Sequence, residues 1–204
     1  STPAHQGQSM QYINGRLIFI QEAERLKNVL RSAHTSTGRH ESTAEHTWRL
    51  CLLAMTFQDL LGPLDFERVL KLCVIHDLGE AIQGDIPAVV RQATPDKSQR
   101  ERRDLMALTK SLPPTLQTEM LALWEDYEYA SSREARIVKA LDKIETIIQH
   151  NQGLNPADFD YAFNLAYGKK HANVHPVIAE LRALVDADTA LRATTAGLGP
   201  SSST

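Results

Sequence analysis

Helix start and stop signals divide most of the 204-residue chain into segments of helical length. Ser42-Thr-Ala-Glu45 has the pattern of a capping box and predicts a helix that ends before Gly62-Pro63. Asp65 is a candidate N-cap for the next helix, and Pro113-Pro114 separates two later ones. Between these signals, apolar residues recur at helical spacing, and the alternation typical of strands is almost absent. The sequence therefore predicts an all-α chain.

The same signals predict where the helices lie and how the chain divides. We expect helices over residues 16–30, 42–61, 66–78, 98–112, 114–129, 131–150, 156–167 and 176–186. Two further capping-box patterns, Ser98 to Glu101 and Ser131 to Glu134, open the fourth and sixth of these. Residues 1–12 and 191–204 are polar or rich in Ser, Thr and Gly, so we expect them to be disordered. Residues 13–190 are then a single domain.

Composition excludes several classes of function. A net charge of -3 and a pI near 6.2 argue against a binder of nucleic acid polymers. No apolar run approaches the roughly 20 residues that span a bilayer, and residues 1–10 lack the pattern of a signal peptide, so no membrane association is expected. Cys51 and Cys73 lie in apolar helical patterns and are interpreted as reduced core thiols of a cytoplasmic protein.

Ionisable residues follow directly on an apolar segment: the stretch HDLGEAIQGDI, residues 76–86, comes straight after the apolar run 69–75. Such groups are costly to bury unless something compensates them. Helical spacing places four of the chain's ionisable residues on inward-facing apolar stripes: His46, His76, Asp77 and Asp142. Three helices of a bundle can bring such side chains to one divalent metal ion. The alternative is a hydrogen-bonded core histidine, or for Asp142 a cap or an ion pair with Lys or Arg.

A longer series of residues resembles a known family. It consists of Arg31, Glu41-Ser42-x-Ala-Glu45-His46, His76-Asp77-Leu78-x-Glu80-x-Ile82-x-Gly84-Asp85-Ile86 and Leu141-Asp142-Lys143. It resembles the HD-domain phosphohydrolases, and among them the 5'-deoxynucleotidase branch, over residues 16–185. The resemblance implies a compact helical bundle of the HD type with a metal site between helices. It also implies that His46, His76, Asp77 and Asp142 hold one divalent ion, which could be Mn, Co, Mg, Fe, Ni or Zn.

The implied reaction is hydrolysis of (deoxy)nucleoside 5'-monophosphates to nucleoside and orthophosphate, with a small-molecule nucleotide as partner. Glu80 would position water or transfer a proton to the leaving oxygen, and Asp85 would contact substrate or assist catalysis. Arg31 would clamp a phosphate. The alternatives are an N-cap or surface ion pair for each acid, and a solvated helix-terminal cation for Arg31. Because relatives often dimerise, a homodimer is expected.

One position departs from the family pattern. Some bacterial members carry an aromatic residue after the arginine, where it packs on the sugar and disfavours a 2'-hydroxyl, whereas this chain has Ser32. Ser32 is therefore a candidate substrate-binding residue for which the resemblance does not imply a preference for deoxyribose. Neither the base preference nor the metal can be read from the sequence.

Two other functions compete with the nucleotidase. The same metal site could cleave dNTPs to nucleoside and triphosphate, although the compact length favours the monophosphatase. A non-catalytic nucleotide- or metal-binding module is the second alternative, and the intact ligand set with Glu80 and Asp85 argues against it. The charged run at residues 97–103 is interpreted as a solvated face or dimer rim, with attraction of an anionic substrate as the alternative, and Trp48, Trp124 and Tyr127 as core.

Overall fold

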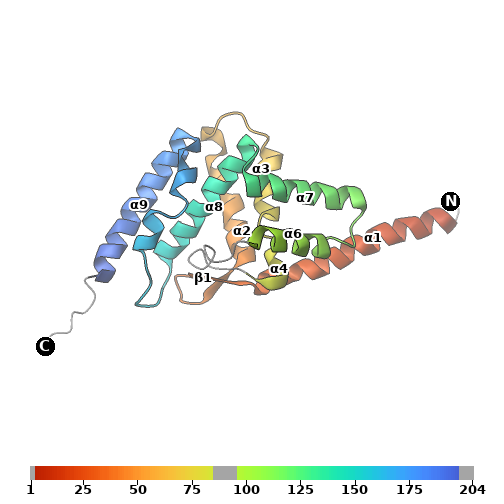
Figure 1. Cartoon of the computed structure of the whole chain (residues 1–204), viewed down its shortest axis with the longest axis horizontal. Helices are drawn as coiled ribbons and strands as arrows, with labels where there is room; N and C mark the ends of the chain where they lie inside the picture. Colours follow the sequence, from red (N-terminus) through yellow and green to blue (C-terminus); the bar gives the residue numbers. More distant parts are fainter. Residues whose placement is uncertain (1–2, 85–95, 198–204) are drawn as a thin grey trace.

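Helices make up most of the structure, a computed structural model that describes residues 3–84 and 96–197, as the all-α prediction requires (Figure 1). They are α1 (Pro3–Ala23), α2 (Thr43–Phe57), α3 (Phe66–Ile75), α4 (Glu80–Gln83), α6 (Lys97–Leu108), α7 (Pro114–Tyr129), α8 (Arg133–Gln152) and α9 (Pro176–Gly197). Short 3-10 helices are η1 (Glu24–Asn28), η2 (Gln58–Leu60), η3 (Ala162–Leu165) and η4 (Lys169–Val174). None of the helices in the described ranges combines the length and apolar character that a bilayer span needs.

Helix α8 lies at the centre of the packing. It contacts α2, α3, α7, α9 and strand β1, and it is buried on most sides, as expected of a helix surrounded by others. Its N-cap is Ser132, whose side chain accepts a hydrogen bond from the Ala135 amide, so the helix begins one residue later than the Ser131 pattern predicted. Gly153 follows its last turn.

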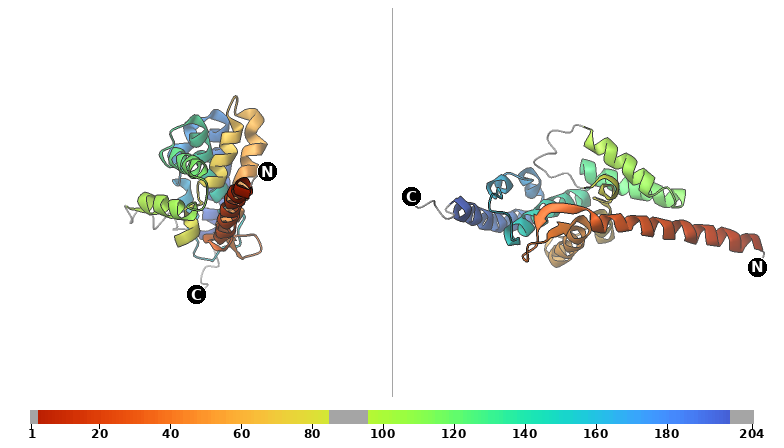
Figure 2. Two further views of the ribbon diagram at one scale, coloured as in Figure 1. Left: turned by 90° about the vertical axis from the view of Figure 1, so that its right-hand side faces the viewer. Right: turned by 90° about the horizontal axis from the view of Figure 1, so that it is seen from below.

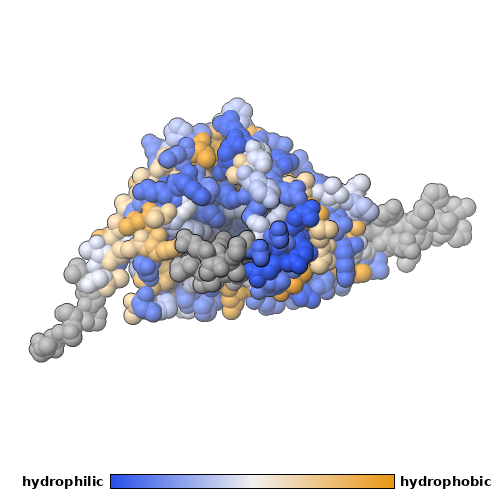
Figure 3. All heavy atoms as spheres, viewed as in Figure 1, coloured by the Kyte–Doolittle hydropathy of each residue, from blue (hydrophilic) through white to orange (hydrophobic). Residues whose placement is uncertain are grey.

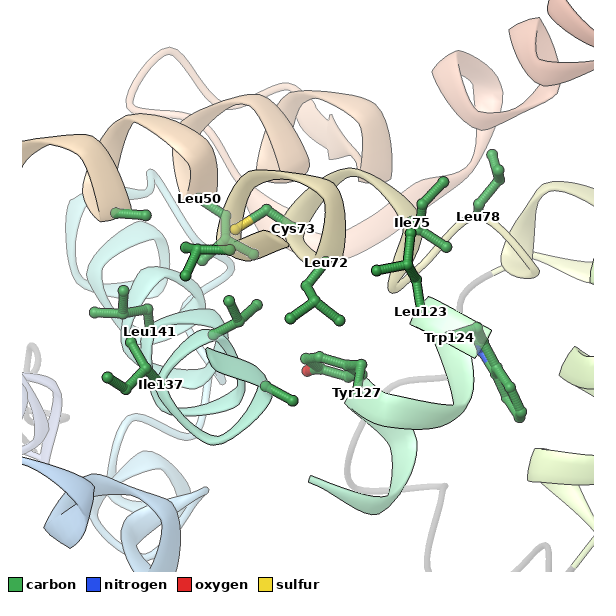
Figure 4. Close-up of a cluster of buried hydrophobic side chains, with 14 of the residues drawn as sticks. Leu50, Leu72, Cys73, Ile75, Leu78, Leu123, Trp124, Tyr127, Ile137 and Leu141 are labelled. Atoms are coloured by element: carbon green, nitrogen blue, oxygen red, sulfur yellow. The ribbon is translucent and has the colours of Figure 1, made fainter. Parts of the chain in front are cut away.

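The apolar core joins α2, α3, α7 and α8 (Figure 4). Leu50, Leu72 and Leu141 are fully buried and come from α2, α3 and α8 respectively. Trp124 and Tyr127 are buried on α7, as predicted, but Trp48 is 63% exposed on α2, so its assignment to the core was wrong. Burial of this kind contributes about 1.5–3 kcal/mol per large apolar side chain. The core therefore fixes the helices that carry the ionisable residues.

A small antiparallel hairpin precedes α2 and was not predicted. Strands β1 (Leu30–His34) and β2 (His40–Ser42) pair with Leu30 opposite Ser42 and His34 opposite His40. The Thr35 amide closes the turn on the Arg39 carbonyl, and Gly38 has a φ of 97°. Strands of five and three residues are too short to show a clear alternation. Arg31 consequently lies on a strand and does not end a helix.

Two capping predictions on helices that carry site residues are confirmed. Ser42 and Glu45 form a reciprocal capping box at the start of α2, and Asp65 accepts from the Arg68 amide at the start of α3. The Ser98 pattern is wrong as a cap, because α6 begins at Lys97 and Ser98 Oγ instead donates a hydrogen bond to Glu128 of α7. Helix α3 ends at Ile75, so His76 is its C-cap.

The ends of the chain also differ from expectation. Residues 3–12 continue α1 and residues 191–197 continue α9, although both were expected to be disordered. Pro3 is compatible with a first helical turn, and a packed helix extends readily into a segment without a stop signal. Helix α1 projects beyond the packed body (Figure 2). The helix expected over 156–167 is only the 3-10 turn η3.

Candidate metal centre

Two histidines and two aspartates from three helices converge below the molecular surface. His46 lies in the first turns of α2, His76 and Asp77 lie at the end of α3, and Asp142 lies in the middle of α8. One ligand atom from each, an imidazole nitrogen or a carboxylate oxygen, lies within 4.8 Å of the others. The structure therefore brings together the four residues that the sequence selected.

His46 is completely buried and is held at both ring nitrogens. Its Nδ1 donates to Glu145 Oε1 at 2.6 Å, and its Nε2 lies 2.6 Å from Asp142 Oδ1 and 3.8 Å from Asp77 Oδ2. Burial and the nearby Arg31 act to lower the pKa of His46, but the hydrogen bonds to Asp142 and Glu145 outweigh them and raise it. Its Nε2 thus faces the two aspartates.

His76 is oriented in the same way by a different partner. Its Nδ1 donates to the Cys73 carbonyl at 2.6 Å, and its Nε2 lies 2.9 Å from Asp77 Oδ2 and 3.3 Å from Asp142 Oδ1. Burial opposes the charged form, yet the two carboxylates raise the pKa of His76 well above its usual value. Both Nε2 atoms therefore point to one centre.

Asp142 presents one oxygen to the histidines and is held by the other. Tyr127 Oη donates to Oδ2 at 2.6 Å, and Lys143 Nζ lies 3.3 Å from the same oxygen. Figure 4 shows the Tyr127 side chain among the core residues that link α7 to α3 and α8. Burial raises the pKa of the Tyr127 hydroxyl, and the negative charges of Asp142 and Asp77 raise it further, so Tyr127 stays a donor.

The donor atoms fit a divalent ion. Two imidazole nitrogens and two carboxylate oxygens form a mixed N/O set, which suits first-row divalent metals and Mg²⁺ more than soft monovalent ones. Both histidines have their other nitrogen tied to an acceptor, the arrangement that presents Nε2 to a metal. The carboxylates supply the negative charge that would compensate a buried cation.

A cavity of about 200 Å³ borders this cluster. His76, Asp77 and Asp142 form one part of its wall. Among the described residues, the cations in its lining are Arg31, Lys97, Lys139 and Lys143, and the other lining residues are Glu101, Tyr127, Glu128 and Tyr167. The face seen in Figure 3 has a hollow with a mainly hydrophilic border. A polar cavity of this kind suits a small anionic ligand.

Arg31 is placed at this cavity by three neighbours. Its Nε lies 3.2 Å from Glu41 Oε1, its NH2 donates to Thr146 Oγ1 at 3.0 Å, and its NH1 lies 3.8 Å from Asp77 Oδ2. Glu41 is buried, and burial together with Glu145 raises the pKa of Glu41 to about 7 although Arg31 lowers it. These contacts hold the guanidinium beside the carboxylate cluster, at the end of the hairpin.

The remaining predicted site residues are Glu80, Asp85 and Ser32. Glu80 begins α4 and is 2% exposed, but it is not part of the four-residue cluster and its Oε1 lies 3.8 Å from Lys97 Nζ. Asp85 lies outside the described residues. Ser32 is exposed beside Arg31 on β1 and does not line the cavity. Successive strand residues point to opposite faces, which accounts for the difference between these two neighbours.

Sequence reasoning missed several residues of the site. Glu145 contacts His46 and Glu41 contacts Arg31, and neither was predicted. Lys97 lines the cavity, which fits the alternative given for its charged run, attraction of an anionic substrate, better than the preferred solvated face or dimer rim. Glu145 follows Asp142 by three residues on the same helical face, so helical spacing could have found it. The positions of Glu41 and Lys97 depend on the hairpin and on the packing of α6.

Comparison with known proteins identifies relatives over most of the chain. The family model described as HD domain matches residues 23–182. The human protein named 5'-deoxynucleotidase HDDC2 is 32% identical over 174 residues, which cover 82% of this chain and 84% of the human protein. The zebrafish (Danio rerio) protein of the same name is 35% identical over 142 residues, 69% of this chain and 70% of its own.

A solved structure agrees with these sequence matches. It is the crystal structure of a protein described as a predicted metal-dependent phosphohydrolase from Magnetospirillum magnetotacticum MS-1. The two share a TM-score of 0.77 and 25% identity, over 92% of this chain and 97% of the other. The similarity thus extends over nearly the whole of both chains.

Proposed function

Because the chain belongs to the HD domain family, we propose that it is a metal-dependent phosphohydrolase that cleaves (deoxy)nucleoside 5'-monophosphates to nucleoside and orthophosphate. One observation carries the proposal: the convergent His and Asp cluster forms part of the wall of a cavity that is also lined by Arg and Lys side chains. Relatives that match most of the chain are named 5'-deoxynucleotidases, which supports the choice of substrate.

The metal would be held by His46, His76, Asp77 and Asp142. Mn, Co, Mg, Fe, Ni and Zn all accept such a mixed set of ligands. A divalent ion bound there supplies positive charge against the phosphoryl oxygens and makes water a better nucleophile at neutral pH. The carboxylates keep the histidines oriented, and Tyr127 keeps Asp142 oriented, so the ligand set is organised before the ion binds.

The charge of the cavity supports a monophosphate. Among the described residues, its lining holds the four cations named above and four carboxylates, Asp77, Glu101, Glu128 and Asp142. These formal charges cancel, so a bound divalent ion would leave the lining with about two positive charges, which matches the charge of a phosphomonoester near neutral pH. A triphosphate carries more negative charge than this lining would balance.

The residues around the cavity then have distinct tasks. Arg31, fixed by Glu41 and Thr146, binds the phosphate through its guanidinium. Water attacks phosphorus, the bond from phosphorus to the 5'-oxygen breaks, and the leaving oxygen takes up a proton. We assign that proton transfer to Glu80, which lies beside Lys97, and we assign contact with substrate to Asp85. Ser32 lies outside the cavity lining, so it does not distinguish ribose from deoxyribose there.

We further propose a homodimer in the cytoplasm. Exposed apolar side chains on the outer face of α2, among them Trp48, Leu52 and Met55, support an interface between copies. The two cysteines are free thiols in the structure, which suits a reducing compartment. Light scattering after gel filtration measures the mass directly, and a monomer at micromolar concentration would contradict the dimer.

Product identification tests the function. Metal-stripped protein is given back Mn²⁺, Co²⁺ or Mg²⁺ and incubated with paired ribo- and deoxyribonucleoside 5'-monophosphates and 5'-triphosphates. We expect orthophosphate and nucleoside from monophosphates, and the ratio of AMP to dAMP turnover reports the sugar preference. Release of triphosphate from dNTPs would overturn the substrate while keeping the metal site. Absence of turnover with a bound ion would favour a binding module.

A further inference from the structure

Glu145 has no place in the reaction described above, yet it is one of the most deeply buried acids of the described residues, with 1% of its surface exposed. It lies one helical turn after Asp142 on α8 and reaches the opposite side of His46. A buried carboxylate needs compensation to be tolerated in a folded protein. The groups that contact Glu145 therefore indicate the role of this buried carboxylate.

The two oxygens of Glu145 have different partners. Oε1 accepts from His46 Nδ1 at 2.6 Å, and Oε2 accepts from Arg49 Nε at 2.9 Å, with Arg49 NH2 at the same distance. Arg49 in turn donates to Gln152 at 2.6 Å near the surface. The carboxylate is thus fixed from outside by an arginine and presents one oxygen inward to the histidine ring.

The contact with His46 dictates the state of the ring. A carboxylate accepts hydrogen bonds and cannot donate them, so an oxygen at 2.6 Å requires the proton on Nδ1. Nε2 also lies 2.6 Å from an Asp142 oxygen, so the metal-free ring carries a proton on both nitrogens. With Nδ1 held by Glu145, Nε2 is the nitrogen that would give up its proton and present a lone pair to a metal, on the side of Asp77 and Asp142. His76 receives the same orientation from a backbone carbonyl, which is uncharged. Glu145 therefore gives His46 a stronger acceptor than His76 has.

A second metal site is the competing reading of the same residues. Ligand atoms of Glu41, His46 and Glu145 also lie within 4.8 Å of one another. However, Arg31 binds Glu41 and Arg49 binds Glu145, so each carboxylate already has a cation beside it. Another divalent ion between two guanidinium groups would meet strong repulsion. The geometry favours hydrogen bonding over metal ligation.

We propose that Glu145 is a positioning residue that fixes the tautomer and orientation of His46 and strengthens its Nε2 as a metal ligand. This inference rests on the proposed function, because it requires the metal at the four-residue cluster. Partners of this kind behind metal-bound histidines typically change metal affinity by about 10- to 100-fold. Arg49 contributes indirectly, because it binds the other oxygen of Glu145 and fixes the carboxylate in place.

Metal affinity of the full-length protein is the decisive measurement. Mn²⁺ binding by E145Q is compared with wild type in competition with a chelator, together with unfolding of the metal-stripped proteins. We expect E145Q to bind Mn²⁺ about 10- to 100-fold more weakly, because the amide keeps the size of the side chain but loses its charge. The matched control is D126N, which breaks the Arg68–Asp126 pair between α3 and α7, and it should keep the affinity for Mn²⁺.

The outcomes separate this inference from the proposed function. A folded E145Q that binds Mn²⁺ as tightly as wild type overturns the role of Glu145 and leaves the nucleotidase proposal intact. Failure of wild type itself to bind Mn²⁺ overturns the metal proposal and this inference with it. If E145Q does not fold, ¹⁵N chemical shifts of the zinc-loaded wild type decide, because the inference requires His46 protonated at Nδ1. The opposite tautomer would overturn it.

Discussion

The hydroxyl of Tyr127 donates a 2.6 Å hydrogen bond to Asp142 Oδ2, the oxygen opposite the one that faces both histidines. Tyr127 belongs to α7 and Asp142 to α8, so this bond ties the last predicted metal ligand to a neighbouring helix. The phenol ring also lies against His76, with ring centroids 4.8 Å apart. One aromatic side chain thereby orients ligands from two helices.

Replacement of Tyr127 by Phe tests this link. The variant keeps the ring and loses the donor, so Asp142 is left with Lys143 alone at Oδ2. We expect metal affinity to fall by about tenfold and unfolding free energy to fall by about 1–3 kcal/mol. Chelator competition and urea unfolding measure these quantities. Y161F, which removes a peripheral hydroxyl bonded to Asn155, is the control and should leave metal affinity unchanged.

Substitution of Asp142 by Asn should abolish the increase in unfolding free energy that metal binding produces. Wild type supplied with Mn²⁺ at 100 times its Kd should gain about 2.7 kcal/mol in unfolding free energy. D142N should gain almost nothing and should lose turnover, because a neutral amide neither compensates the ion nor pairs with both histidines. D188N, in an exposed pair with Arg192, should keep the full gain. An equal gain in D142N would place the ion elsewhere.

Substitution of Arg31 by Lys should separate phosphate binding from metal binding. An ammonium keeps the charge but loses the planar fork that contacts Glu41 and Thr146 together. We expect kcat/KM for a nucleoside monophosphate to fall by about 10²-fold while Mn²⁺ affinity stays within a few fold. Steady-state kinetics give the first number and chelator competition the second. R192K is the surface control, and unchanged kinetics in R31K would remove Arg31 from the site.

The sequence predicted the parts of this site that local patterns control. Ser42 and Glu45 identified the start of α2, and helical spacing then placed His46 on its buried side. His76 and Asp77 follow an apolar run that was interpreted as a buried helix, and Asp142 continues a buried stripe on α8. Each of these conclusions needs only residues within a few helical turns, which is the range over which periodicity is informative.

Residues that depend on long-range packing were placed wrongly or missed. Arg31 was assigned to a helix end because a hairpin with strands of five and three residues leaves little alternation to detect. For Lys97 a solvated surface or dimer rim was preferred over attraction of an anionic substrate, yet α6 packs so that its ammonium reaches the cavity beside Glu80. Glu41 acquires its role only when β2 pairs with β1. None of these contacts is encoded by neighbouring residues alone.

Acid should destabilise the protein through His150. Burial and the nearby Arg31 lower the pKa of His150 from 6.5 to about 4, and its Nδ1 accepts from the Asn164 amide. Between pH 6.5 and pH 4, His150 is protonated in the unfolded chain but neutral in the folded protein. The free energy of unfolding therefore falls as the pH drops from about 6.5 to about 4. The loss should reach about 3 kcal/mol. Urea unfolding of metal-stripped protein across this range measures it, and H150Q should show a shallower pH dependence than the exposed control H40Q.

Gly168 packs closely against the side chain of Lys143, which lines the cavity. It has a φ of 63°, and a Cβ there would lie 2.6 Å from Lys143 Cβ and 2.5 Å from its Cγ. G168A should therefore lose about 1–2 kcal/mol from backbone strain alone and more from the clash. The control is G62A, which has a φ of 77° but whose Cβ would meet only Arg133 NH2, at 4.0 Å, so it isolates the strain. Because Lys143 contacts Asp142 and lines the cavity, G168A should also raise KM for a nucleoside monophosphate, whereas G62A should not. Equal stability and equal KM in the two variants would show that the position of Lys143 does not depend on Gly168.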